Sequence, residues 1–112
     1  DNVRVKGENV SAFEVEHVAA QHPAVEDCAM IGVAADVGEQ DIKLFVKAKP
    51  DAHIDPAELS AWLAERLAPY QNPRYIVVVD EFERTPSQRI MKHRLTQRDD
   101  PAWDRLQYGS KP

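Results

Sequence analysis

The chain has 112 residues, which is enough for one domain and too few for two. Its formal net charge is −5, which argues against broad nucleic-acid binding because such proteins usually carry a strongly basic face. Apolar residues make up 43% of the chain, as in ordinary globular proteins, and no apolar run is long enough to cross a bilayer.

The first predicted elements are an extended segment, residues 3–6, and a helix. Ser11 and Glu14 are spaced as a capping box, in which each side chain satisfies a backbone N–H of the other residue. Apolar residues then recur at helical spacing. Pro23 ends the helix, because the residue before a proline disfavours helical backbone. The chain starts without an initiator methionine, so we expect it to be a piece of a longer protein.

Two strands are predicted next. Residues 25–33 are rich in small and β-branched side chains. They include Cys28, which we expect to be a packed small side chain. A single cysteine excludes an internal disulfide and suits a reducing compartment, so we expect a cytoplasmic protein. Residues 41–49 alternate between apolar side chains and lysines or Phe45, which predicts a half-exposed strand. Its three lysines would discourage edge-to-edge pairing if the strand lies at a sheet edge.

The second helix has its own start signal. Asp55 is placed to cap it, Pro56 takes the first helical position and Glu58 completes a capping box. Leucines and Trp62 follow at helical spacing, so we expect Trp62 in the core. Residues 74–80 are nearly all apolar after the first and predict a buried strand.

The predicted order is β-α-β-β-α-β, which indicates an α+β fold. We expect a small sheet with the two main helices packed on one face. The pattern weakens after residue 95, so residues 1–95 form the predicted domain and residues 96–112 a C-terminal tail. Three apolar side chains could anchor this tail, or it could be loose; they are Trp103, Leu106 and Tyr108.

A compact cationic segment follows the last predicted strand. The stretch "TPSQRIMKHRL", residues 85–95, carries two arginines, a lysine and a histidine beside a Thr-Pro turn, with Arg84 just before it and no carboxylate within it. In an acidic chain, such a segment indicates a local anion site. The four histidines show no metal-ligand spacing, so we expect no metal site in this chain.

Three stretches, in order, resemble the C-terminal domain of adenylate-forming enzymes, the acyl-CoA synthetase superfamily. "VRVKGENVSAFEVE" resembles the segment that opens that domain, and "HPAVEDCAMIGVAADVGEQDIKLFVKAK" resembles its central hairpin. "APYQNPRYIVVVDEFERTPSQRIMKHRL" is similar to its end, where members typically show Thr-x-x-Gly-Lys-Ile-x-Lys. The resemblance covers residues 1–95, and the first stretch is most similar to the carnitine/crotonobetaine-CoA ligase branch and related fatty-acyl-CoA ligases.

The resemblance implies a mobile lid on a larger N-terminal adenylation domain, which holds ATP and a carboxylic acid. The whole enzyme would form acyl-CoA from the acid, ATP and CoA through an acyl-adenylate, with Mg²⁺ in the full-length enzyme and not on this piece. Arg89 stands at the position of the family's catalytic lysine. Lys6, Gly7 and Glu8 match the segment expected along the CoA arm. Arg74 could lie near the nucleotide or CoA, or be an ordinary solvated charge. The piece alone would be inactive.

The chain departs from the family pattern where Gln88-Arg89 replaces Gly-Lys. Arginine keeps the charge, but its planar fork does not substitute for a compact ammonium, and Gln88 removes a glycine that would let the backbone bend. Arg89 could work less well in the same role, the pair could be a deliberate substitution, or the adenylation step could be changed or lost. Lys92 matches the family's second lysine.

A second hypothesis needs no larger enzyme. A small α+β domain could stand alone as a regulatory or docking module, with residues 89–94 binding a phosphate or an acidic peptide. The length of the chain upstream of residue 1 would separate the two hypotheses.

Overall fold

The computed structural model describes residues 2–5, 7–35, 39–98 and 100–109. The strands are β1 (Asn2–Val5), β2 (Glu8–Ser11), β3 (Val25–Ala34), β4 (Gln40–Ala48), β5 (Tyr75–Val79) and β6 (Trp103–Asp104). The helices are α1 (Ala12–Ala19), α2 (Pro56–Ala64) and α3 (Lys92–Leu95), with a 3-10 turn η1 (Pro69–Gln71) and a π-helical turn η2 (Arg105–Gly109). No helix in these ranges combines the length and apolar character needed to cross a bilayer.

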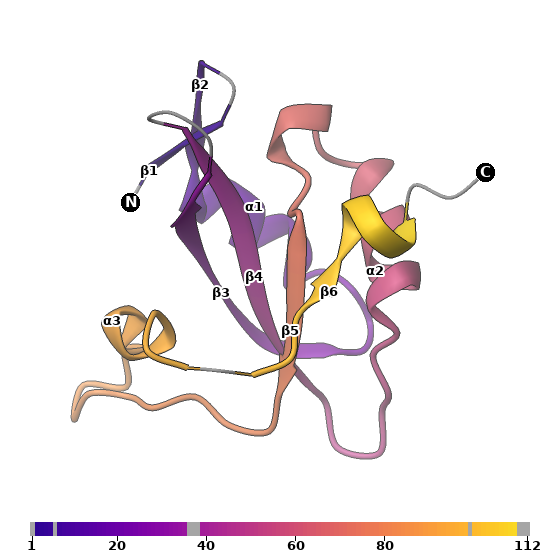
Figure 1. Ribbon diagram of the computed structural model, residues 1–112. Helices are drawn as coiled ribbons and strands as arrows, with labels where there is room; N and C mark the ends of the chain where they lie inside the picture. The colour runs from indigo at the N-terminus through magenta and orange to yellow at the C-terminus, as the bar shows by residue number, and fades with distance from the viewer. Residues whose placement is uncertain (1, 6, 36–38, 99, 110–112) are drawn as a thin grey trace.

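The strands form a four-stranded sheet and a separate hairpin (Figure 1). In the larger sheet the order is β3-β4-β5-β6, and only the β4–β5 pair is parallel. A parallel pair needs a crossover, and α2 supplies it between β4 and β5. β1 and β2 pair with each other through a tight turn at Gly7. The segment predicted as one extended piece is therefore a hairpin.

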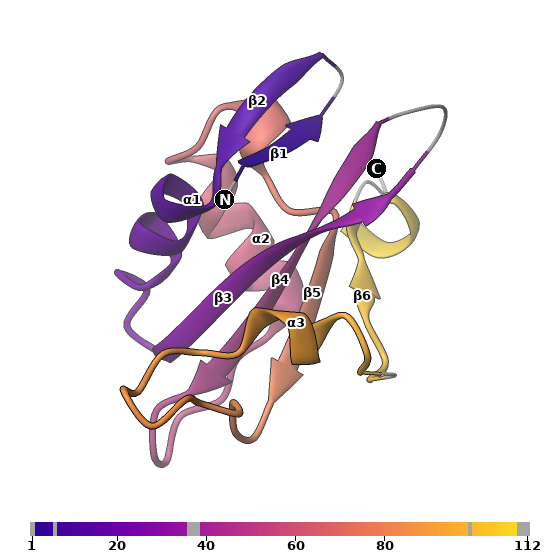
Figure 2. The ribbon, with the colours of Figure 1, turned by 90° about the vertical axis from the view of Figure 1, so that its left-hand side faces the viewer.

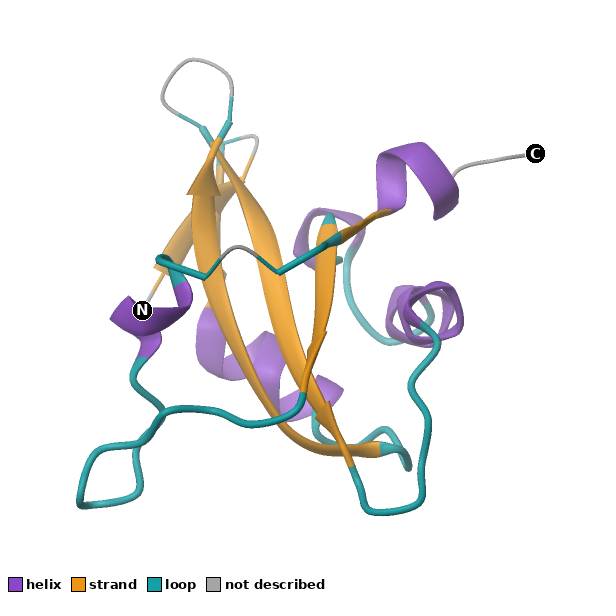
Figure 3. Cartoon of the chain, turned by 60° about the horizontal axis from the view of Figure 1, so that its bottom comes forward, coloured by secondary structure: helices purple, strands orange, loops and turns teal. Residues whose placement is uncertain are grey.

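Two hydrophobic clusters cover the two faces of the larger sheet. The first joins α1 and α2 to one face, through residues such as Val15, Leu59 and Leu44. The predicted α+β architecture, with two main helices on one face, is confirmed (Figure 3). The second cluster lies on the opposite face, where Phe45 packs with Leu95 of α3. The prediction of a half-exposed β4 is therefore wrong, because this strand is interior to the sheet and buried on both faces.

Both helix starts use the predicted capping residue, but neither glutamate closes a box. Ser11 Oγ accepts the Glu14 N–H at 3.5 Å, while Glu14 Oε1 accepts a hydrogen bond from the Gln71 side chain at 3.3 Å. Asp55 Oδ1 accepts the Ala57 N–H at 3.0 Å. Each glutamate is thus used in a tertiary contact.

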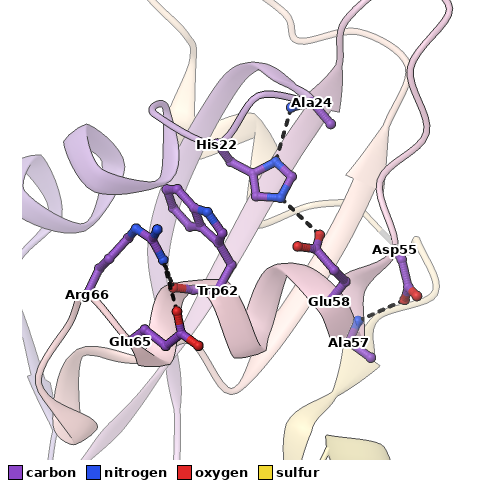
Figure 4. A network of polar contacts seen from close by, with 8 residues as sticks. All are labelled: His22, Ala24, Asp55, Ala57, Glu58, Trp62, Glu65 and Arg66. Carbon is purple, nitrogen blue, oxygen red and sulfur yellow. Dashed lines mark hydrogen bonds and ion pairs between the residues drawn. The ribbon is translucent and has the colours of Figure 1, made fainter.

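His22 joins the end of α1 to the start of α2 (Figure 4). Its ring is buried, and its Nδ1 accepts the Ala24 N–H at 3.1 Å. Its Nε2 lies 2.9 Å from Glu58 Oε1, and because Nδ1 is an acceptor, Nε2 is the donor. The ring also meets Trp62 edge-on, at a centroid distance of 5.0 Å. Trp62 is half-buried at the margin of the core, not inside it as predicted.

The segment after residue 95 folds back on the sheet. Trp103 packs against the first hydrophobic cluster, and β6 pairs with β5. The Arg105 N–H adds a hydrogen bond of 2.8 Å to the Arg74 carbonyl. Leu106 remains 51% exposed, and the side chain of Tyr108 lies outside the described part of the structure. Of the three side chains that the sequence suggested as anchors of the tail, Trp103 packs against the core.

Candidate functional site

The cationic segment folds into a narrow loop between β5 and α3. Arg84 and Ile90 form an antiparallel bridge at its base, and the Thr85 N–H donates to the Arg89 carbonyl at 2.8 Å. The Gln88 N–H donates to the Thr85 carbonyl at 2.8 Å, which closes a turn. Gln88 has a φ of +71°, in the left-handed region. A turn followed by a left-handed residue is a common hairpin connection, and glycine is the usual residue there.

Arg89, which directly follows this turn, is exposed. Three neighbouring cations are held by carboxylates: Arg84 pairs with Asp27, Lys92 with Glu16 at 2.7 Å, and Arg94 with Glu83 at 3.5 Å. Among the residues that the structure describes, the Arg89 guanidinium makes no hydrogen bond or ion pair, and only its backbone is bonded, to Thr85. Its charge therefore points to solvent, available to an anion or to a larger partner.

The second candidate segment is the turn of the β1–β2 hairpin. Gly7 has a φ of +83°, and a Cβ atom placed there would meet no described residue within 4 Å. Its N–H donates to Glu39 Oε1 at 3.2 Å, and the Arg4 N–H donates to Gln40 Oε1 at 3.2 Å. These two side chains attach the hairpin to the start of β4. Glu8 is exposed, whereas Lys6 lies outside the described residues.

The two candidate segments lie at opposite ends of the molecule, as both ribbon views show (Figures 1 and 2). The hairpin turn reaches the loop that leaves β3, whereas the Arg89 loop is tied through Arg84 to Asp27, near the first residue of β3. Ala34, the last residue of β3, lies seven residue steps after Asp27, which corresponds to about 23 Å of strand. The structure therefore does not bring Arg89 and Gly7 together.

Arg74 is held in two ion pairs and is not an ordinary solvated charge. Its guanidinium holds both carboxylate oxygens of Asp104, at 3.1 and 3.3 Å, and Asp41 Oδ2 at 2.9 Å. Burial opposes ionisation of Asp104, but the hydrogen bonds from Arg74 and from the Leu106 N–H outweigh it and lower the pKa of Asp104. Arg74 thereby ties β6 to the start of β5.

A cavity of about 390 Å³ opens beside this ion pair. Its lining combines two arginines, Arg74 and Arg105, with the half-exposed ring of Tyr70. Asn72 also lines it, and its buried Oδ1 has no hydrogen-bond partner among the described residues. The cavity therefore combines two cationic groups with the Asp41 carboxylate and an acceptor that has no partner among the described residues.

Glu16 contacts both Cys28 and Lys92: its carbonyl accepts a hydrogen bond from the Cys28 thiol, and its carboxylate pairs with Lys92. One Glu16 carboxylate oxygen, Oε2, accepts the Met30 N–H at 2.8 Å and pairs with Lys92. Cys28 is buried, and burial with the nearby Glu16 charge raises the pKa of its thiol to about 12. The thiol is therefore unreactive at neutral pH, as a packed side chain should be. Among the described residues, no three His, Cys, Asp or Glu side chains are grouped as a metal site would require.

The sequence also matches a known family over residues 14–89, described as the AMP-binding enzyme C-terminal domain. This chain belongs to that family. The match ends at Arg89, and it confirms the resemblance seen in the three sequence stretches. The described fold agrees, because the Bacillus subtilis o-succinylbenzoate CoA synthetase superposes with a TM-score of 0.82 and 25% identity, over 91% of this chain and 21% of that one.

Relatives of this AMP-binding C-terminal domain are much longer acyl-CoA ligases. A 2-succinylbenzoate–CoA ligase of Geobacillus kaustophilus is 40% identical over 80% of this chain and 18% of its own length. The crotonobetaine/carnitine–CoA ligase of Salmonella arizonae is 30% identical over 83% of this chain and 18% of its own. A Brucella canis acyl-CoA synthetase structure gives a TM-score of 0.78 and 32% identity, over 85% of this chain and 18% of that one. The chain thus spans under one fifth of these three relatives.

Sequence reasoning found Arg89 and Gly7 through the family pattern, but it missed the residues that hold them. Asp27, Glu39 and Gln40 stand in ordinary strand or turn positions, and only the fold shows their contacts. The sequence placed Arg84 beside the cationic segment, but it did not show that Arg84 contacts Asp27.

Proposed function

We propose that this chain is the C-terminal lid of an ATP-dependent acyl-CoA ligase, which converts a carboxylic acid, ATP and CoA to acyl-CoA, AMP and pyrophosphate. The observation that carries this proposal is that the Arg89 guanidinium is exposed and has no hydrogen-bond or ion-pair partner among the described residues. We take residues 1–95 as the lid and residues 96–112 as a tail, of which the described part around Trp103 packs on the lid. The lid acts with an N-terminal adenylation domain of the same protein, in the cytoplasm, and is inactive alone.

In the first half-reaction, a carboxylate oxygen of the acid attacks the α-phosphorus of ATP. The new P–O bond gives the acyl-adenylate, and the bond to the leaving pyrophosphate breaks. Two anions must approach each other, and negative charge builds on the phosphate oxygens. A fixed cation lowers this barrier electrostatically, and Arg89 supplies it from the lid. Closure and opening of a lid couple such a step to the rest of the cycle.

In the second half-reaction, the CoA thiol loses its proton to solvent, its sulfur forms a bond to the acyl carbonyl carbon, and the C–O bond to the leaving AMP breaks. Lys6, Gly7 and Glu8 line the path of the pantetheine arm in our proposal. The open space around Gly7 supports this, because an arm can approach the backbone there. Arg74 stands beside a cavity with Arg105 and could contribute to CoA binding by giving up a bond to Asp41.

The relatives guide the choice of acid and acceptor. We favour CoA because the 40%-identical ligase and a 33%-identical medium-chain fatty-acid–CoA ligase of Escherichia coli carry it in their names. Other relatives are a fatty acid–acyl-carrier-protein ligase and an amide bond synthetase, which define the alternative acceptors to test. For the acid, we propose carnitine-like and fatty acids first. We propose that the Mg²⁺ that accompanies ATP is held by the rest of the full-length enzyme.

The test uses the full-length enzyme, a panel of carboxylic acids and a pyrophosphate-release assay. We expect release with at least one acid, a loss of about 100-fold in Arg89→Ala, and equal or higher activity in Arg89→Lys. Absence of release in both the parent and Arg89→Lys would refute the ligase proposal. Tight binding of ATP or pyrophosphate to the 112-residue chain alone would instead favour the stand-alone module.

A further inference from the structure

Arg84 links the Arg89 loop to the central sheet. Its Nη2 pairs with Asp27 Oδ2 in β3, and its Nη1 donates to the Gln88 carbonyl oxygen at 2.9 Å. Its backbone also bridges to Ile90 across the base of the loop. One side chain therefore connects a strand of the core to the peptide that directly precedes Arg89.

Asp27 is a well-anchored partner for this link. The β3–β4 register shifts between Val25 and Asp27, and such a bulge changes the direction in which a strand side chain points. The other carboxylate oxygen of Asp27 accepts the Cys28 N–H at 3.0 Å, which fixes the orientation of the group. The next residues of β3, Cys28 to Ile31, are buried, so the partly exposed Asp27 directly precedes a stretch of the core.

The Arg84 side chain bonds the backbone of Gln88, a residue in an unfavourable backbone conformation. Gln88 holds a left-handed φ of +71°, a conformation that residues with a Cβ atom adopt only at an energetic cost. The Arg84 bond holds its carbonyl in place. The Arg89 guanidinium has no bond of its own among the described residues, so its position depends on this backbone.

We infer that Asp27 and Arg84 are positioning residues, which hold the Gln88-Arg89 peptide so that Arg89 is presented to the reacting phosphate. This inference rests on the proposed function, because the reaction is the one assigned to Arg89 above. Arg84 and Asp27 touch no substrate in this scheme and act only through the loop. They should therefore affect adenylation and leave the later thioester step unchanged, since the Gly7 segment lies at the other end of β3.

The test compares Asp27→Asn, Arg84→Gln and Arg98→Gln in the full-length enzyme. Arg98 is a matched control: it also joins an aspartate, Asp100, to a backbone carbonyl, that of Glu81. We expect kcat for pyrophosphate release to fall about tenfold in the first two variants, with KM for ATP and acid within twofold. Conversion of supplied acyl-adenylate to acyl-CoA should stay within twofold in all three, and Arg98→Gln should match the parent.

Asp27→Asn separates positioning from a direct charge effect. It keeps an oxygen for the Cys28 N–H and leaves the Arg84 charge in place, so unchanged adenylation in this variant would overturn the inference. A second measurement needs no activity: amide hydrogen exchange of a peptide covering residues 83–91 should accelerate in Asp27→Asn and Arg84→Gln, and not in Arg98→Gln. An enzyme with no activity would refute the proposed function, while unchanged exchange would refute the link itself.

Discussion

Replacing Gln88 with glycine should stabilise the chain. Gln88 has a φ of +71°, and this left-handed conformation costs about 1–2 kcal/mol for a residue with a Cβ atom. Glycine removes that cost but loses more conformational freedom on folding, which offsets about 0.5–1 kcal/mol of the gain. The net gain should be about 0.5–1 kcal/mol. For a chain of this length, it corresponds to a rise in Tm of roughly 2–5 °C.

Urea unfolding, followed by the fluorescence of Trp62 and Trp103, measures this change because both rings pack against the core. Gln88→Ala is the matched control and should show no gain, since alanine keeps the Cβ atom. Gly7→Ala tests the same physics in reverse: its φ is +83° and its Cβ would meet no atom, so backbone conformation alone should cost about 1 kcal/mol. A loss of stability in Gln88→Gly, beside the expected loss in Gly7→Ala, would refute the assignment of Gln88 to the left-handed region.

Three further predictions concern the packing that supports the candidate segments. His22→Ala should destabilise the chain by about 2 kcal/mol in urea, because the buried ring is lost and the partly buried Ala24 N–H loses its acceptor, whereas His22→Asn, which can keep an acceptor, should lose less. Asp104 has a pKa below its usual 3.8, so its ion pair with Arg74 stabilises the fold above that range and is lost as the pH falls through the lowered value. Acid titration of stability should therefore be flatter in Asp104→Asn, and an unchanged profile would contradict this reading. Cys28, with a pKa of about 12, should react with a thiol reagent at pH 8 far more slowly in the native chain than in urea; equal rates would show that it is exposed.

Local sequence signals predicted the two main helices and the three longer strands correctly. Ser11 and Asp55 cap their helices as expected, because an N-cap needs only residues two or three positions away. The partners of Glu14 and Glu58 were not predicted, since Gln71 and His22 lie 57 and 36 residues away in the chain. A local spacing cannot show that a distant side chain competes for the same carboxylate.

The burial of β4 was missed for a similar reason. The lysines in β4 indicated an exposed face, yet Phe45 is completely buried there by Phe82 and Leu95, which come from much later in the chain. β2, α3 and β6 are two to four residues long, too short for a periodic pattern to form. At the candidate site, the family pattern pointed to Arg89. Only the fold could show that Arg84, Lys92 and Arg94 pair with carboxylates, whereas the Arg89 guanidinium has no such partner among the described residues.

The placement of the two candidate segments explains why one lid could serve two reactions in turn. Each segment is tied to the same antiparallel pair, Arg89 through Asp27 near the start of β3 and Gly7 through Glu39 in the connection to β4. These strands are bonded along their length and buried on both faces, so the pair is stiff. With about 23 Å of strand between the attachment points, bending cannot bring both segments to one reaction centre. If both act in the proposed cycle, the whole lid must turn as a rigid body between adenylation and thioester formation. Glu39→Ala should then slow only the second step, by loosening the hairpin turn, whereas an equal loss in pyrophosphate release would show that the two ends are not separated in function.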